Sequence, residues 1–129
     1  TFHSEAKRRQ DDKVLLIYTA GMPSPAWRAM YRRLLESLPR TTPIYHWGDV
    51  DEGGFRIAST IAAVARGAGF SLQPYGMSPD DVPLDMRVRA SARTLERIHH
   101  FACAAGWPEL GQAIREAEFV AEQETLERE

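Results

Sequence analysis

Three short apolar segments rich in β-forming residues alternate with two helical patterns in the first 80 residues of the chain. The three segments, each bounded by loop-forming residues, are KVLLIYT (13–19), PIYHWGD (43–49) and FSLQPYG (70–76). Ser24 and Pro25 mark the start of a helix over 24–38, and apolar residues at helical spacing predict a second helix over 54–66. Crossover connections between parallel strands are right-handed in almost all proteins. The alternation therefore predicts an α/β fold, with a parallel sheet flanked by helices.

The pattern changes after residue 80. Apolar residues at helical spacing over 84–105 predict one helix, which Gly106 ends. Pro108 then begins a last helix, which carries Val120 on its buried face. We therefore expect a helical C-terminal part.

The composition is that of one ordinary globular domain. The chain has 129 residues, 43% of them hydrophobic, and its net charge of −2 gives no global indication of nucleic-acid or membrane binding. No run of about 18 apolar residues occurs, so no transmembrane helix is expected. The single cysteine, Cys103, excludes an internal disulfide, fits a reducing cytoplasm and stands among alanines, which predicts that it is buried. We expect a single domain over 1–129, with a core over about 1–79 and a helical extension over about 80–129.

The segment IYHWGDVDEGGFRIA places three acidic residues where a strand is expected to end and a helix to begin. In open α/β sheets, ligands bind at the carboxyl ends of the strands. Asp49 and Asp51 are two residues apart, so on an extended backbone their carboxylates face the same way, while Val50 faces the other. Mg²⁺ prefers hard oxygen ligands of this kind. The spacing therefore indicates a candidate metal-binding pair.

The residues around this pair favour a phosphodiester substrate. Gly53 and Gly54 permit a sharp turn and let a phosphate approach the backbone, and the N-terminus of the next helix favours an anion. Arg56 and His46 are further candidate substrate contacts, although the alternation around His46 is equally consistent with partial burial. The simpler interpretation is that Asp caps the helix and Gly forms a turn, with no ligand at all.

The longer string GDVDEGGFRIA, at a strand-to-helix junction, resembles the acidic D-x-D motif of Toprim domains, which occur in topoisomerases, primases and some nucleases. The wider sequence is similar to one branch in particular, the C-terminal domain of the Wadjet nuclease subunit JetD, which is related to the topoisomerase VI A subunit. The similarity extends from Thr1 to about Leu126 and is carried, in order, by TFHSEA, LLIYTAGMPSPA, HWGDVDEGGFRI, PYGM and AEQE.

This resemblance implies a Toprim-like, Rossmann-like fold and a nuclease activity. In Wadjet systems, which are bacterial defences, an SMC-like motor complex senses circular plasmid DNA and the JetD-like subunit cuts it at a Toprim metal site. Carried onto this sequence, Asp49 and Asp51 are the catalytic, metal-binding pair for Mg²⁺ or Mn²⁺. Glu122 and Glu124 match an acidic feature of the family, with Glu122 as a further metal ligand and Glu124 in a solvated position.

The resemblance also implies partners and a location. The partners are double-stranded DNA, the SMC-like subunits of the same defence system and, in the full-length protein, a second copy of the same chain. No membrane partner is implied, and the location is the cytoplasm.

One element of the Toprim pattern has no counterpart here. Toprim domains carry a glutamate at the end of the first strand, which in this branch lies in a Glu-Asn segment shortly before TFH. The chain begins at Thr1 with that TFH. We therefore expect a C-terminal fragment of a larger protein, and we expect these 129 residues alone not to cut DNA.

Two other functions remain open from the residues. One is a non-catalytic Toprim-like module that binds DNA or partner subunits. The other is an unrelated phosphotransferase or phosphatase in which Asp49 is the nucleophile.

A stripe of arginines stands apart from the acidic segment. Arg89, Arg93 and Arg97 are spaced four residues apart, which places them on one helical face. Phosphate contacts would use such a face. The expectation is instead a solvated face, paired locally with Asp85 or Glu96.

Overall fold

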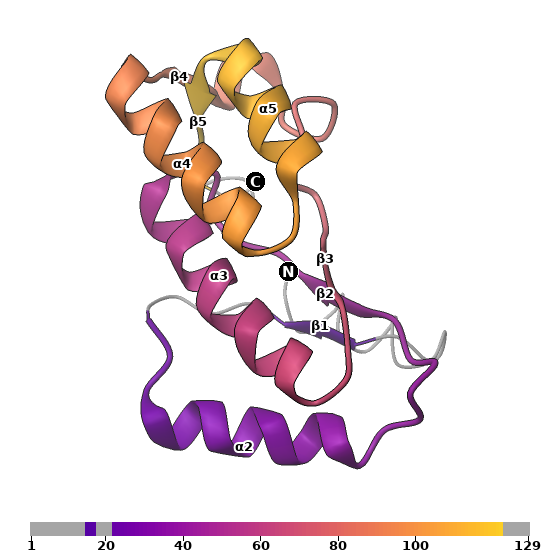
Figure 1. Cartoon of the computed structure of the whole chain (residues 1–129). Coiled ribbons are helices and arrows are strands. Elements are labelled where there is room, and N and C mark those ends of the chain that lie inside the picture. Colours follow the sequence, from indigo (N-terminus) through magenta and orange to yellow (C-terminus); the bar gives the residue numbers. More distant parts are fainter. Residues whose placement is uncertain (1–14, 18–21, 123–129) are drawn as a thin grey trace.

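The structure of the protein, a computed structural model, describes residues 15–17 and 22–122. Its strands and helices follow one another along the chain as shown in Figure 1. Their bounds are β1 Leu15–Ile17, α2 Pro25–Glu36, β2 Ile44–His46, α3 Glu52–Gly67, β3 Leu72–Pro74, a 3₁₀ helix Leu84–Met86, β4 Val88–Arg89, α4 Ala92–Ala104, α5 Pro108–Ala117 and β5 Phe119–Val120.

The strands β1, β2 and β3 form a parallel sheet in that order. Ile44 of β2 pairs with Leu15 of β1 on one side and with Leu72 of β3 on the other. The carboxyl ends of all three strands therefore lie at the same edge of the sheet. The predicted parallel pairing of the first two strands is confirmed, and the predicted intervening helices are α2 and α3, within two residues of their predicted bounds.

Helix α3 is the central helix of the described fold. It contacts α2 and β3 as well as α4, and in Figure 1 it lies between α2 and α4. Phe55 and Ile61 are completely buried on this helix, and so is the small Ala58 between them. Alanine at such a position lets neighbouring elements approach the helix closely, while the two larger side chains fill the core.

Trp107, between α4 and α5, connects the C-terminal helices to the sheet. Its indole Nε1 donates a buried hydrogen bond to the carbonyl oxygen of Leu72 at 2.8 Å. Its ring also lies edge-on to Phe55, with ring centroids 6.3 Å apart. The helices that follow residue 91 thus pack on the same core as the sheet.

The prediction of one helix over 84–105 is wrong. A 3₁₀ helix and β4 come first, and α4 begins only after Ser91, whose side chain caps the helix by accepting from the amide of Thr94. Leu84 is 79% exposed and Val88 is 64% exposed. Their helical spacing with later apolar residues therefore did not reflect a common buried face.

The last helix is also shorter than predicted. Helix α5 ends at Ala117, because Glu118 adopts a left-handed backbone conformation with φ of 56°. The chain then reverses, and Val120 lies in β5, where it pairs with Val88 of β4 in an antiparallel ladder. The helical extension predicted over about 80–129 is therefore corrected: its described part contains two α-helices, a 3₁₀ helix and a two-stranded antiparallel sheet.

Two smaller expectations concern Cys103 and the membrane. Cys103 is exposed, so the prediction that it is buried is wrong, and its Sγ lies 3.8 Å from Nε2 of His99. In the described part of the chain, no helix has both the length and the apolar character needed to cross a membrane.

Candidate functional site

The residues between β2 and α3 form an acidic turn at the carboxyl end of the parallel sheet. Val50 is completely buried, whereas Asp49 and Asp51 on either side of it are partly exposed. Asp51 has an extended backbone, with φ of −151° and ψ of 176°. Successive side chains on such a backbone point to opposite faces. The burial of the three residues follows the alternation expected from the sequence.

Asp51 is the N-cap of α3. Its Oδ1 accepts a hydrogen bond from the amide of Gly54 at 2.6 Å, and its carbonyl oxygen accepts from the amide of Phe55 at 3.1 Å. The capping role that the sequence left open is therefore correct for Asp51. A carboxylate has a second oxygen with its own lone pairs. The cap thus fixes the orientation of the side chain without using all of its capacity to bind a cation.

The two glycines that follow have different surroundings. A Cβ atom on Gly54 would lie 2.0 Å from the carbonyl oxygen of Asp49, so the turn packs directly against this glycine. A Cβ atom on Gly53 would meet only Oδ1 of Asp51, at an ordinary 3.7 Å. Gly54 is buried and its amide is bonded to Asp51, whereas Gly53 is exposed. Of the two glycines expected to approach a phosphate, Gly53 is the one at the surface.

A β-bridge joins the acidic turn to the last described residues. The amide of Val50 donates to the carbonyl oxygen of Ala121 at 2.8 Å, and the amide of Ala121 donates back at 2.9 Å. With these two residues opposite each other in antiparallel fashion, the register places Glu122 across from Asp49. Asp51 leaves the backbone on the same side as Asp49. The bridge therefore brings Glu122, from a distant part of the chain, alongside the acidic turn.

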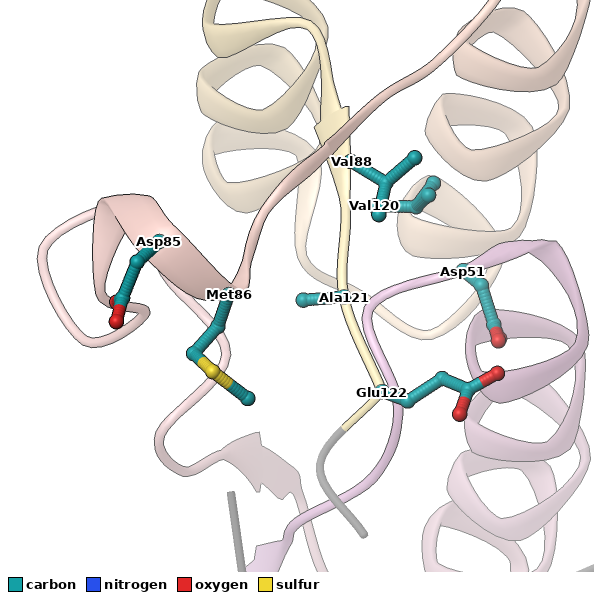
Figure 2. Close-up of a pocket in the computed structure, with 7 residues that line it drawn as sticks. All are labelled: Asp51, Asp85, Met86, Val88, Val120, Ala121 and Glu122. Atoms are coloured by element: carbon teal, nitrogen blue, oxygen red, sulfur yellow. The ribbon is translucent and has the colours of Figure 1, made fainter. Parts of the chain in front are cut away.

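A groove of about 460 Å³ lies beside this bridge. In Figure 2 the carboxylates of Asp51 and Glu122 point toward each other at one end of the groove, whereas Asp85 and Met86 lie on the 3₁₀ helix at the other end, with the Asp85 carboxylate pointing away from the other two. The groove is lined by Asp51, Asp85, Met86, Val88, Val120, Ala121 and Glu122. Asp85 and Val120 were not expected here, because their positions depend on the β4–β5 pairing, for which the sequence shows only apolar residues at helical spacing.

The acidic residues do not form a closed cage for a metal. Among residues 15–17 and 22–122, no three His, Cys, Asp or Glu side chains are grouped closely enough to hold a metal ion. Asp51 and Glu122 nevertheless line one groove, and carboxylate oxygens are the ligands that Mg²⁺ prefers. Glu124 lies outside the described residues.

His46, one of the candidate substrate contacts, lies in the core. Its side chain is 1% exposed, and neither ring nitrogen has a hydrogen-bond partner in the described structure. The ring stacks on Trp107 at 6.3 Å between centroids, and a Cβ atom on Gly48 would lie 2.7 Å from its Nε2. Burial lowers the pKa of His46 from 6.5 to about 4, so the ring is neutral at pH 7. In this arrangement the side chain faces protein rather than a molecule bound at the surface.

Arg56, the remaining candidate substrate contact, is exposed on α3. An ion pair forms nearby between Nε of Arg97 on α4 and Oε2 of Glu52 at 2.9 Å. The local pairing with Asp85 or Glu96 that we expected for the arginine stripe is therefore wrong for Arg97, and Arg89 lies in β4 rather than on the helical face that carries Arg93 and Arg97. The actual pair arises because α3 and α4 pack together, which no local spacing in the sequence encodes.

Comparison with known proteins gives two matches. The family model described as "Wadjet protein JetD, C-terminal" matches residues 3–127. Wadjet protein JetD of Bacillus cereus (strain Q1) is 34% identical over 80 residues. This alignment covers 60% of the chain and 18% of that relative, so the match spans less than a fifth of the relative's length. No solved structure gives a significant match.

Proposed function

The chain belongs to the family of JetD C-terminal domains, and we propose that it is the metal-dependent DNA endonuclease domain of a bacterial Wadjet-type anti-plasmid defence protein. The observation that carries the proposal is that the Val50–Ala121 bridge brings Glu122 onto the face of the acidic turn, where it lines one groove with Asp51. This face lies at the carboxyl end of a parallel sheet, where α/β proteins bind ligands. The same arrangement supports a Toprim-like fold, with the acidic turn directly after the second described strand.

Each carboxylate has a distinct part in this proposal. Asp51 holds the start of α3 through Oδ1 and offers its second oxygen to a cation. Asp49, in the turn, offers its carboxylate to the same cation, and so does Glu122, in the segment after β5. Mg²⁺ or Mn²⁺, when bound, supplies charge neutralisation at the scissile phosphate and a lowered pKa for a bound water. The protein's contribution is to keep the three acidic side chains on one face, with the turn fixed by the cap at one side and by the bridge at the other.

The N-terminus of α3 is the proposed position of the scissile phosphate. The first amides of a helix carry partial positive charge, and the helix begins next to the acidic pair at the exposed Gly53. Glu52, in the first turn, would repel a phosphate, but its ion pair with Arg97 offsets that charge. A phosphate bound here would adjoin the face that carries the carboxylates.

Family membership also underlies our proposals for partners. We propose double-stranded DNA as the substrate, the SMC-like subunits of the same defence system as partners, a homodimer as the state of the full-length protein, and the cytoplasm as its location.

Nicking of supercoiled plasmid by the full-length protein tests this function. We expect cleavage that needs Mg²⁺ or Mn²⁺, stops in EDTA and is abolished by Asp49→Asn and by Asp51→Asn. Glu109→Gln, a charge-matched change at an exposed position on α5, should leave cleavage intact. Cleavage that survives both aspartate substitutions would rule out this site.

The same protein preparation distinguishes the two alternatives. DNA binding without cleavage in either metal would favour a non-catalytic module. A trapped phospho-aspartate at Asp49 would favour a phosphotransferase.

A further inference from the structure

Three exposed arginines gather around one glutamate at the junction of α3 and α4. Arg97 on α4 pairs with Glu52 on α3 at 2.9 Å. Arg56 is four residues after Glu52 on α3, and Arg93 is four residues before Arg97 on α4, so each lies one helical turn from the pair and on the same side of its helix. We call Arg56, Arg93 and Arg97 the arginine border.

The arginine border carries more positive charge than its neighbours neutralise. Within the described residues, the guanidinium groups of Arg56 and Arg93 have no hydrogen-bond or ion-pair partner. Arg97 uses its Nε to bond Glu52, which leaves the four donors on its two terminal nitrogens. Of the three positive charges of the border, only that of Arg97 is paired with a carboxylate among the described residues.

Two other arginines of the C-terminal half each pair with one glutamate. Arg115 pairs with Glu96 at 2.7 Å, and Arg89 pairs with Glu118 at 3.3 Å. The border differs from these two pairs, because its three arginines have a single glutamate partner among the described residues.

The arginine border lies next to the acidic turn. Glu52 follows Asp51 directly in the chain, and Asp51 lines the acidic groove. A polyanion that reached the acidic face with one phosphate would bring its neighbouring phosphates past α3 and α4. Arginine is suited to this contact, because its planar guanidinium donates paired hydrogen bonds to phosphate oxygens.

We propose that Arg56, Arg93 and Arg97 bind backbone phosphates of double-stranded DNA beside the bond presented to the acidic turn, with Glu52 as the residue that positions Arg97. This proposal rests on the proposed function, because it takes DNA as the substrate. Phosphate contacts fix the register of a protein on DNA without reading its sequence. The border therefore orients the duplex and gives no base preference.

The test is the salt dependence of binding to a short linear duplex, measured by fluorescence anisotropy in EDTA so that no cleavage occurs. The proteins compared are the wild type and the single variants Arg56→Ala, Arg93→Ala and Arg97→Ala. The control is Arg33→Ala, which removes the same charge from an exposed position on α2, a helix that packs on α3. Melting temperatures confirm that each variant is folded.

Counterion release sets the expected size of the effect. Each phosphate contact contributes about 0.9 to the slope of log affinity against log salt, which is about 3.5-fold in affinity between about 50 and 200 mM salt. Each border variant should therefore lose about that much salt dependence, whereas Arg33→Ala should keep the wild-type slope. Border variants with the slope of Arg33→Ala would overturn the proposal.

Two further results separate this proposal from the nuclease function. Asp51→Asn should lose cleavage and keep the wild-type salt slope, because Asp51 acts on the reaction and not on the flanking phosphates. If Asp51→Asn loses cleavage but the arginine variants bind DNA like the wild type, the phosphate-binding role of the arginine border is wrong and the proposed nuclease function stands. A wild-type protein that binds no DNA in any salt would overturn both proposals.

Discussion

Val50 and Ala121 exchange two backbone hydrogen bonds, of 2.8 and 2.9 Å, and so join the acidic turn to the segment that follows the last helix. This bridge places Glu122 beside the acidic turn, where it lines one groove with Asp51. Asp51 is fixed separately, by its own cap on α3. The position of Glu122 therefore depends on the C-terminal segment, whereas the position of Asp51 depends on the helix that it begins.

The cap predicts different stabilities for two substitutions at Asp51. Asparagine caps helices about as well as aspartate, so Asp51→Asn should leave the free energy of unfolding near that of the wild type. Asp51→Ala removes the acceptor for the Gly54 amide and should lower the free energy of unfolding by about 1 kcal/mol. Urea denaturation measures both values, and an equal loss in the two variants would contradict the capping role.

Gly53 and Gly54 form a matched pair for a second prediction. Gly54→Ala places a methyl group 2.0 Å from the carbonyl oxygen of Asp49, so the turn must shift, at a cost of about 1–3 kcal/mol. Gly53→Ala meets only an ordinary contact and should be neutral, or more stable by up to about 1 kcal/mol, since alanine favours helix. Thermal and urea unfolding of both variants checks this, and a tolerated Gly54→Ala would contradict the close approach of the turn.

Tyr31 predicts a stabilising substitution. Its hydroxyl is buried with no hydrogen-bond partner in the described structure, and burial raises the pKa of the phenol. Tyr31→Phe removes this unsatisfied group and keeps the ring that stacks on Trp27 at 4.9 Å. The free energy of unfolding should stay the same or rise by about 1 kcal/mol. A clear loss of stability in urea would show that the hydroxyl has a partner.

His46 predicts a stability that falls in mild acid. Its pKa in the folded protein is about 4, below its ordinary value of 6.5, so between these values the unfolded chain binds more protons than the folded one. Stability should therefore decrease as the pH falls through this window, by roughly 3 kcal/mol in full.

Two variants isolate the contribution of His46 from that of the carboxylates, which titrate in part of the same range. His46→Leu should flatten the pH dependence of the free energy of unfolding, and His100→Gln, at an exposed position, should leave it unchanged. The same dependence in His46→Leu and in the wild type would contradict the assignment.

The sequence predicted the parallel part of the fold because its signals are local. A short apolar run marks each strand, and Ser24 with Pro25 marks the start of α2. The β4–β5 pair had no such signal, because each strand has two residues and Val88 is largely exposed. Apolar residues over 84–105 at helical spacing therefore suggested one continuous helix, whereas its first part is a 3₁₀ helix and the strand β4, and only the rest forms α4.

The residues of the candidate site also fall into two groups, those marked by local sequence features and those placed only by tertiary packing. Asp49 and Asp51 could be singled out because their spacing and the following glycines are local features. The partner of Arg97 could not, because Glu52 reaches it only through the packing of α3 on α4. Glu122 was indicated by family resemblance, but its relation to Asp49 required the Val50–Ala121 bridge.

The most direct test of the central claim is the binding of Mn²⁺ to the full-length protein, measured by electron paramagnetic resonance. We expect Mn²⁺ affinity to fall by about tenfold or more in each of three variants, Asp49→Asn, Asp51→Asn and Glu122→Gln. Replacing a residue that only orients a metal ligand already lowers metal affinity by about tenfold, so replacing a ligand should lower it at least as much. Glu109→Gln, which removes the same charge from an exposed position on α5, should bind Mn²⁺ like the wild type. Wild-type affinity for Mn²⁺ in the double variant Asp49→Asn, Asp51→Asn would contradict the claim that the acidic turn holds the metal.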